Sequence, residues 1–500
     1  MSDSPISDLS LSDPAGSSLL SSPLARGPGS LPRQRQLIQR LKQAILAGQL
    51  PAGGKLPSSR ALSEELEISR NTVLIAYEQL TAEGYVIADR QGTRVAPLSA
   101  SARSAARQAV AADAEPPATA RRLARIVSTR QAHDSSLPMT PGTPALTQFP
   151  LNAWRRAQDR ALQTAPATVL GYGHPAGEPA LRDAIAQYLR VSRGVHCDAS
   201  RIVITEGAQG GLALCVQLLT NPGDTAWLED PGYRGAKAAF HAGDLNVVAM
   251  RVDADGIVIP DSAWTQPPRL IQTTPSHQYP TGAVLSLSRR LDMLERARRA
   301  GAWIIEDDYD SEFRHQGEPI AAMQGLLPDA PVLYVGTFSK TMFPALRLGF
   351  LVLPEAIARE AMPSIIEMQR GGHRLEQLTM AAFIENGQFS RHLGRMRRLY
   401  RERQAALREA LAAHLGIEHE VLGGHCGLHL TVRLPPAYAD TAIVAEARKL
   451  GMNPSALSTF ALVPRDEDNG LVIGYGNTGA ERFPALVRQL RDVARACSTR

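Results

Sequence analysis

Cysteine is scarce in this sequence of 500 residues, and the four cysteines that it has are scattered. They are Cys197, Cys215, Cys426 and Cys497, with no CxxC pair among them. This pattern argues against a disulfide framework and against a zinc site. Because scattered free thiols are typical of a reducing compartment, we expect a cytoplasmic location.

Long apolar runs are absent as well. No stretch reaches the roughly 20 apolar residues that a membrane-spanning helix needs. The first residues lack the basic-then-apolar order of a signal peptide. We therefore expect no membrane partner, and the hydrophobic content of 44% suits a soluble globular protein.

A strong overall charge is also missing, since the formal net charge is only +5. The positive excess is uneven, however. Residues 31–96 carry nine Lys or Arg against six Asp or Glu, residues 97–133 carry six against two, and residues 134–500 are neutral by the same count. A basic first quarter favours a nucleic-acid partner for that part of the chain.

The length exceeds that of one ordinary hydrophobic core, so two or more domains are expected. Residues 1–30 are rich in Ser, Pro, Leu and Gly without periodicity, which predicts a disordered tail. The rest of the chain divides into a compact module over 31–96, an Ala/Ser/Arg-biased linker over 97–135, a large domain over 136–390 and a small C-terminal domain over 391–500.

The module over 31–96 has the pattern of a helix-turn-helix followed by a wing. In "LPSSRALSEEL", Ser58 or Ser59 is placed to cap a short helix, and "EISRNTVLIAYEQLTAEGY" predicts a second helix after Ile68. "YVIADRQGTRVA" is typical of two short strands that turn at Gln91–Gly92. Such a second helix offers its first residues to base edges and phosphates. These residues are Ser69, Arg70, Asn71 and Thr72. The alternative is a small helical domain with ordinary surface charges.

From residue 136 onward, strand-like runs such as "RIVIT", "TAWLE", "AWIIEDD", "VLYVG" and "LGFLVL" alternate with helical stretches. The alternation predicts an α/β main domain with a largely parallel sheet and helices on both faces. A basic helical segment near 376–414 leads to a smaller α/β region with strands near 428–433 and 471–475.

The segment "GTFSKTMFPALRLG" puts Lys340 directly after a buried strand, where an amine needs a partner. Asp307 and Tyr309 stand two apart at the end of another strand, so they project from one face. "ITEGAQGG" runs from a strand into a helix, whose first N–H groups suit a phosphate. A lysine nucleophile, an acid and a phosphate cradle together indicate pyridoxal phosphate (PLP).

In this interpretation Lys340 forms the Schiff base, Asp307 keeps the ring nitrogen protonated and Tyr309 bonds the ring hydroxyl. Tyr233, after a Pro-Gly turn, is expected to stack on the ring. The side chains expected at the phosphate are Thr337, Ser339 and Arg347.

Each of these signals is weak alone. A strand-end lysine is more often a surface residue, and "EDDYDSEF" is more often a solvated acidic loop. A metal site is disfavoured because no His or Cys cluster matches the acidic run. That run comprises Glu306, Asp307, Asp308 and Asp310.

The motifs resemble those of a known family. "LPSSRALSEELEISRNTVLIAYEQLTAEGY" resembles the winged-helix module of GntR-type regulators. "YGHPAGEPALR", "TEGAQGG", "EDPGY", "TPSHQYPTG", "EDDYDSEF" and "GTFSKTMFPALRLG" look like the fold-type I aminotransferase domain of the MocR-type GntR subfamily. The resemblance covers about residues 31–96 and 136–480 and implies operator DNA as a partner, PLP as cofactor and a homodimer.

The resemblance also implies roles for single residues. The residues that it assigns to PLP are Lys340, Asp307, Tyr309, Tyr233, Ala208, Gln209, Thr337 and Arg347, with Tyr172 reaching the phosphate of the partner subunit. The residues that it assigns to DNA are Arg60 and Arg70, joined by Gly92 and Thr93 from the wing.

Two departures from the family pattern stand out. Tyr279 occupies the place of Asn in the N-P-T-G motif of simple aminotransferases, so His277 and Gln278 are expected to line the pocket in unassigned roles. Val472 stands where an arginine usually grips the substrate carboxylate. Losing that charge-assisted pair costs roughly 1.5–3 kcal/mol, and Arg465 is a candidate substitute.

Three hypotheses follow: a PLP-dependent transcription regulator with an aminotransferase-like sensor, a working aminotransferase with an added DNA-binding domain, and a regulator whose second domain only dimerises. The intact PLP set argues against the third, and the missing arginine argues against the second. We favour the regulator, with at most weak transaminase activity. Its effector, either PLP itself or an amine or amino acid, stays open, as do the operator and the direction of regulation.

Overall fold

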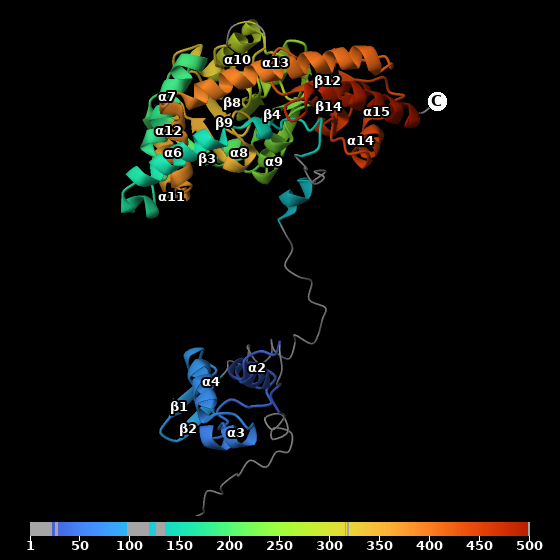
Figure 1. Cartoon of the computed structure of the whole chain (residues 1–500). Coiled ribbons are helices and arrows are strands. Elements are labelled where there is room, and N and C mark those ends of the chain that lie inside the picture. Colours follow the sequence, from blue (N-terminus) through green and yellow to red (C-terminus); the bar gives the residue numbers. More distant parts are fainter. Residues whose placement is uncertain are drawn as a thin grey trace, which may run out of the picture. The chain divides into compact units, whose positions relative to one another are not determined.

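The computed structural model describes residues 23–25, 29–97, 120–126, 136–315, 317 and 320–498. The chain separates into two compact units, Met1–Thr119 and Ala120–Arg500. Figure 1 colours the first unit blue and the second from cyan to red. Among the described residues, no helix is long and apolar enough to cross a membrane.

The first unit is the predicted helix-turn-helix with a wing. Its elements are α2 (Arg33–Leu46), α3 (Ser59–Glu65), α4 (Arg70–Ala82), β1 (Val86–Asp89) and β2 (Gly92–Val95), with β1 and β2 antiparallel. The side chain of Ser58 caps α3 by accepting from the Ala61 N–H, and Ser69 caps α4 by accepting from the Thr72 N–H, both at 3.1 Å. These caps satisfy first-turn donors and set where the two helices begin.

One residue of the predicted tail belongs to this unit. Leu24 is 4% exposed and packs into the core that the three helices share with the hairpin. The neighbouring Ala25 N–H donates to Gln36 Oε1 at 2.9 Å. The prediction of a disordered tail over 1–30 is therefore wrong at Leu24, because burying a leucine side chain stabilises a fold by about 1.5–3 kcal/mol. Residues 1–22 and 26–28 lie outside the described residues.

The second unit is built on an eight-stranded sheet in the order β3-β10-β9-β8-β7-β4-β5-β6. The strands are β3 (Ile202–Glu206), β4 (Thr225–Asp230), β5 (Asn246–Asp253), β6 (Gly256–Ile257), β7 (Leu270–Thr273), β8 (Trp303–Asp308), β9 (Val332–Thr337) and β10 (Leu348–Val352). The pairings from β9 through β8, β7 and β4 to β5 are parallel, whereas β10 runs antiparallel to β3 and β9. The predicted largely parallel sheet is confirmed.

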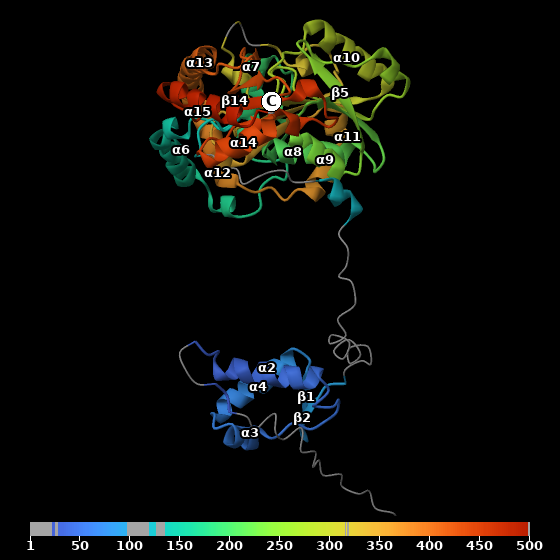
Figure 2. The ribbon, with the colours of Figure 1, turned by 90° about the vertical axis from the view of Figure 1, so that its right-hand side faces the viewer.

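Helices cover both faces of this sheet. On one face lie α8 (Gly207–Leu219), α9 (Arg234–Ala242) and α11 (Glu355–Met368), and on the other α7 (Pro179–Arg193), α10 (Leu287–Ala300) and α13 (Gln388–His414). Figures 1 and 2 show α8 and α9 below the strands and α10 and α13 above them. The side chains of β9 alternate accordingly, with Leu333 and Val335 toward α8 and Val332 and Tyr334 toward the opposite face.

A second, antiparallel sheet of four strands completes the unit in the order β11-β12-β14-β13. Its elements are β11 (Glu420–Leu422), β12 (His429–Arg433), β13 (Ser455–Ala456) and β14 (Gly470–Gly474), with α14 (Asp440–Lys449) and α15 (Phe483–Ala496). The strands predicted near 428–433 and 471–475 are present. The chain near Met139 joins this sheet, since the Gly474 N–H donates to Met139 O at 3.0 Å.

The predicted helical segment near 376–414 is two helices rather than one. α12 (Arg374–Glu385) packs against α6 (Leu151–Thr164), and α13 begins after a break at Asn386–Gly387. Gly387 has φ +67°, a backbone conformation that glycine adopts at little cost and that ends a helix. The expected domain boundary at residue 390 falls inside α13.

Part of the predicted linker over 97–135 is ordered against the second unit. Residues Arg121–Arg125 form a 3₁₀ turn, and Arg125 makes an ion pair with Asp244. Residues 98–119 and 127–135 lie outside the described residues.

Candidate functional site

Three strand ends converge where Lys340 lies. β8 and β9 are parallel, with Asp307 opposite Val335, so Lys340 follows the end of β9 beside the end of β8. β10 enters in the opposite direction, with Leu348 opposite Glu206 and Gly349 opposite Thr337. The carboxyl ends of β3, β8 and β9 thus share one edge, which is where open α/β sheets bind ligands.

Lys340 is half-buried at this edge. Its Nζ donates to Gly142 O at 2.8 Å. Gly142 has φ +69°, and a Cβ atom built there would lie 2.9 Å from the lysine Nζ. Gly142 therefore leaves the space that the amine occupies.

Asp307 is a buried carboxylate with one oxygen unsatisfied. It is 4% exposed, and its Oδ1 has no hydrogen-bond partner among the described residues. Burial, helped by the neighbouring charges of Asp308 and Glu229 and opposed by Lys340, raises the pKa of Asp307 to about 7. A cationic N–H donor beside Oδ1 would satisfy this group and keep it ionised.

The other acids of the run are satisfied inside the protein. Glu306 accepts from the backbone N–H groups of Met323 and Gln324 at 3.0 and 3.1 Å. Asp308 makes a 2.9 Å ion pair with Arg193 and accepts from another buried side chain, the Tyr334 hydroxyl, at 2.5 Å. Asp307 is thus the acid of this strand that is left for a ligand.

The predicted phosphate residues surround the N-terminus of α8. This helix begins at Gly207, which has φ +66°, and its first-turn N–H groups at Ala208 and Gln209 have no intrahelical acceptor. Arg347 donates to Glu206 O at 3.3 Å, just before that helix. On the other side of β10, the Ser339 N–H donates to Thr337 Oγ1 at 3.2 Å. Positive dipole, cation and hydroxyl together make an anion site.

The aromatic residues form one wall. Tyr233 precedes α9 and meets the Tyr279 ring edge-on, with centroids 6.1 Å apart. Tyr279 also contacts Phe460 and Val472 in a small apolar cluster. Tyr172, by contrast, is 93% exposed at the surface of the unit, and its predicted contact with the partner subunit stays a prediction.

The late strand holds no cation at the expected slot. Val472 is fully buried in β14. Arg465, the candidate substitute, makes ion pairs with Asp230 at 2.8 Å and Asp468 at 3.3 Å. Its charge is compensated by these two carboxylates.

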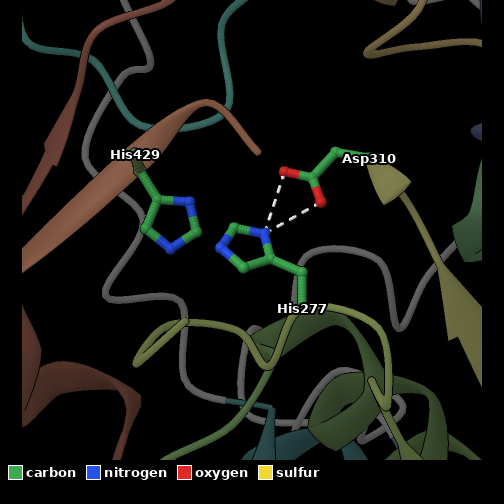
Figure 3. A group of neighbouring side chains, drawn as sticks. All are labelled: His277, Asp310 and His429. Carbon is green, nitrogen blue, oxygen red and sulfur yellow. Dashed lines mark hydrogen bonds and ion pairs between the residues drawn. The ribbon is translucent and has the colours of Figure 1, made fainter. Parts of the chain in front are cut away.

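The sequence analysis missed a histidine–aspartate group. Figure 3 shows His277, Asp310 and His429, and one ligand atom of each lies within 4.8 Å of the others. The prediction that no histidine cluster matches the acidic run is wrong, because the fold brings His277 and His429 beside Asp310. The three residues are too far apart in the sequence for any local motif to reveal the group.

His277 and Gln278 have different environments. His277 Nδ1 lies 2.9 Å from Asp310 Oδ1 and 3.0 Å from Tyr309 Oη. Gln278 donates to Glu229 Oε2 at 3.1 Å and to Pro231 O at 3.0 Å. These hydrogen bonds connect the segment that contains Gln278 to the end of β4.

A cavity of about 620 Å³ lies elsewhere in this unit. It is lined by residues at the amino ends of β8 and β9, including Trp303 and Pro331, and by Arg298 of α10. This edge is opposite to the one that carries Lys340, so the cavity plays no part in the site.

The predicted DNA residues lie at the adjoining starts of α3 and α4. Arg60, Ser69, Arg70 and Asn71 are exposed, and Thr72 is half-buried. Arg70 Nε donates to Ser59 Oγ at 3.3 Å, which links the two helix starts. The wing residues Gly92 and Thr93 are half-buried at the start of β2.

Comparison with known proteins agrees with both units. The family "Bacterial regulatory proteins, gntR family" matches residues 33–95, and "Aminotransferase class I and II" matches residues 141–458. The chain is 37% identical to the probable rhizopine catabolism regulatory protein MocR of Rhizobium meliloti over 92% of this chain and 94% of that protein. It is 30% identical to the pyridoxine biosynthesis transcriptional regulator PdxR of Corynebacterium glutamicum over 93% and 96%.

Among solved structures, LysN, an α-aminoadipate aminotransferase from Thermus thermophilus, matches with a TM-score of 0.68 and 25% identity. The match covers 76% of this chain and 97% of LysN, whose structure contains N-(5'-phosphopyridoxyl)-L-leucine. The chain belongs to the MocR-type subfamily of GntR transcription regulators, in which a winged helix-turn-helix is joined to an aminotransferase-like fold.

Proposed function

We propose that this regulator binds operator DNA through α4 and senses PLP, or an amino compound that reacts with PLP, through the site at Lys340. The observation that carries the proposal is the unsatisfied carboxylate of Asp307 beside Lys340. A buried acid without a donor is costly, and the pyridine N–H of PLP is the kind of donor that would offset that cost.

The residues fit the other parts of PLP as well. When bound, PLP supplies an aldehyde that a lysine amine can attach to and a ring that accepts electrons. Lys340 is the attachment residue, and Tyr233 stacks on the ring. The α8 N–H groups, Thr337 and Arg347 hold the phosphate, and Tyr309 bonds the ring hydroxyl.

The substrate end of the site favours sensing over turnover. A working aminotransferase must orient the carboxylate of its substrate, and oriented binding contributes much of its rate. Here Val472 offers no charge, and Arg465 is already paired with Asp230 and Asp468. We therefore expect transamination to be slow or absent.

The assembly is proposed as a cytoplasmic homodimer. Tyr172 is the residue proposed to reach the phosphate of the partner subunit, and its almost complete exposure within one chain is compatible with that role. A dimer would also present two winged helices to two half-sites of an operator.

The test is attachment of PLP to Lys340. Purified protein should absorb in the visible range, and borohydride should fix one PLP per chain on the peptide that contains Lys340. Lys340→Ala should lose both signals, whereas Lys237→Ala, a control on α9, should keep them. A fixed adduct in the Lys340→Ala protein would show that the attachment residue is wrongly assigned.

A further inference from the structure

We propose that the His277–Asp310 pair is a positioning device that aims the hydroxyl proton of Tyr309 at the ring hydroxyl of PLP. This inference rests on the proposed function, because it concerns the same site. It assigns a role to His277, which the resemblance leaves without one.

The geometry places three oxygen atoms around one ring nitrogen. His277 Nδ1 lies 2.9 and 3.2 Å from the two oxygens of Asp310, as Figure 3 shows. The same nitrogen lies 3.0 Å from Tyr309 Oη. The His277 and Tyr309 rings are stacked, with centroids 5.8 Å apart. The other ring nitrogen, Nε2, has no partner among the described residues, so Nδ1 alone orients the imidazole.

The neighbours of Nδ1 determine which atom carries the hydrogen. A bare lone pair on Nδ1 would face the carboxylate lone pairs of Asp310, which is repulsive. Nδ1 therefore carries the hydrogen and donates it to Asp310. A nitrogen that donates cannot accept from Tyr309, so the tyrosine oxygen can only accept at this contact. The hydrogen of the Tyr309 hydroxyl must then point away from His277.

Packing holds the pair in place. The side chains of His277 and Asp310 are 1% and 2% exposed. Gly427 covers them, and a Cβ atom there would lie 2.1 Å from His277 Cε1 and 2.4 Å from Asp310 Oδ2. The ring of His429 also packs against His277, with centroids 4.9 Å apart. Burial lowers the pKa of His429 to about 3, so this neighbour stays neutral.

Several titratable groups face this arrangement. Those that act on Tyr309 are Asp310, Tyr279, Cys426 and Asp307, and those within electrostatic range of His277 are Asp310, His429 and His315. The charge of Lys340 interacts electrostatically with both Asp307 and His429. Lys340, the proposed attachment residue, therefore belongs to the same group of interacting charges. Each single variant below replaces one residue and leaves the other groups of this arrangement in place.

The readout is the pH midpoint of the visible spectral change of lysine-bound PLP. A tyrosine that donates to the ring oxygen stabilises the oxygen's anion and so lowers this midpoint. His277→Ala removes the group that aims the hydroxyl, so the midpoint should rise by about one pH unit. Tyr309→Phe should raise it similarly.

Two further variants separate positioning from general damage. His277→Asn keeps an N–H near the place of Nδ1–H and should restore most of the wild-type midpoint, and it also serves if His277→Ala does not fold. In the Tyr309→Phe background, His277→Ala should cause no additional shift, since residues that act through one another are not additive. His241→Asn, at a half-buried histidine of α9 outside this arrangement, should leave the midpoint unchanged.

Four results would overturn the inference. They are an unshifted midpoint in His277→Ala, an equal shift in His277→Asn, a full additional shift in the Tyr309→Phe background, and a transition metal bound one-to-one by the wild type but not by His277→Ala. A wild type without any visible band would overturn the proposed function and this inference with it. A normal wild-type band with any of the four results would overturn this inference alone.

Discussion

The two units of the chain carry their candidate binding residues in opposite ways. In the winged helix, Ser69 to Thr72 are consecutive, mostly exposed, and positioned by one helix cap. In the aminotransferase-like unit, the site draws on residues from Gly142 to His429, and Asp307, His277 and His429 are almost completely buried. One surface is made by local structure, whereas the other exists only once the whole unit has folded.

This difference predicts where substitutions are costly. An exposed arginine at a helix start can be lost with little effect on folding, because water replaces its partners. A buried charge has no such replacement, and removing its partner leaves the charge uncompensated. We therefore expect folding defects from changes that break a buried ion pair of the second unit, and pure binding defects from changes of exposed charges in the first.

The largest expected effect is at Asp308. Its ion pair with Arg193 is almost completely buried, so Asp308→Asn should lower the free energy of unfolding by about 3–5 kcal/mol. All four tryptophans lie between residues 154 and 303, so tryptophan fluorescence during urea unfolding reports on this unit alone. Glu355→Ala, which removes the exposed pair with Arg359, should cost about 0.5 kcal/mol or less. Equal losses of unfolding free energy in Asp308→Asn and Glu355→Ala would contradict the expectation that buried pairs matter more than exposed ones.

Asp307 should behave differently, because its pair is proposed to arrive with PLP. In the apo-protein its pKa is raised from 3.8 to about 7, so the folded state keeps a proton that the unfolded state has lost. Stability from this group therefore falls as pH rises from about 4 to about 7, by roughly 1.4 kcal/mol for each unit of difference.

Asp307→Asn removes this dependence without changing the side-chain shape. The apo-variant should melt above the apo-wild type at pH 8, and the gap should close toward pH 4. The same variant should bind PLP more weakly, since it loses the acid opposite the ring nitrogen. A melting difference that does not change with pH would rule out the buried acid as its cause.

The predictability of the two units follows from the same contrast. The cap residue Ser69, Gly84 just after the end of α4 (φ +77°) and the turn at Gln91–Gly92 are local signals. The helix-turn-helix and wing could therefore be predicted from short stretches. The signal for the break between α12 and α13 is equally local, because Asn386–Gly387 is a turn sequence. The prediction of one helical segment near 376–414 did not take this turn into account. Leu24 could not be assigned, since a stretch rich in Ser, Pro, Leu and Gly has no periodicity that would reveal which of its leucines is buried.

Only the part of the site at the strand ends could be predicted from the sequence. Lys340 follows one apolar strand and Asp307 lies at the end of another, and parallel strands bring their ends together, so strand pattern alone places both at one edge. The sequence does not predict which acids of the run are paired inside the protein and which one is left for a ligand. The partners of Glu306 and Asp308 come from distant segments that only the fold brings near. The same holds for His277 beside Asp310.

A smaller effect is expected at the DNA surface. Arg70→Ala should weaken operator binding by about 1–3 kcal/mol, because Arg70 lies at the start of the proposed recognition helix. Its unfolding and its PLP absorbance should match the wild type. Arg35→Ala, on an exposed face of α2, is the matched control and should have less effect on operator affinity. Operator affinity that is unchanged in Arg70→Ala at fixed salt would contradict the proposed docking.

The last prediction joins the two units through the effector. If PLP itself is sensed, adding it to apo-protein should change operator affinity by about 1–3 kcal/mol without any amino compound, the range typical of allosteric coupling. If an amine or amino acid is sensed, PLP alone should change little, and one member of a ligand panel should shift both the visible spectrum and DNA binding. Val472 and the paired Arg465 leave an amino acid without a carboxylate anchor at these two positions, which favours PLP or a simple amine. Titration of apo-protein with PLP on labelled operator DNA distinguishes the two, with Lys340→Ala as the control that should not respond. Identical affinities of apo- and PLP-loaded protein would reject PLP as the effector, and by reciprocity operator DNA would then leave the affinity for PLP unchanged as well.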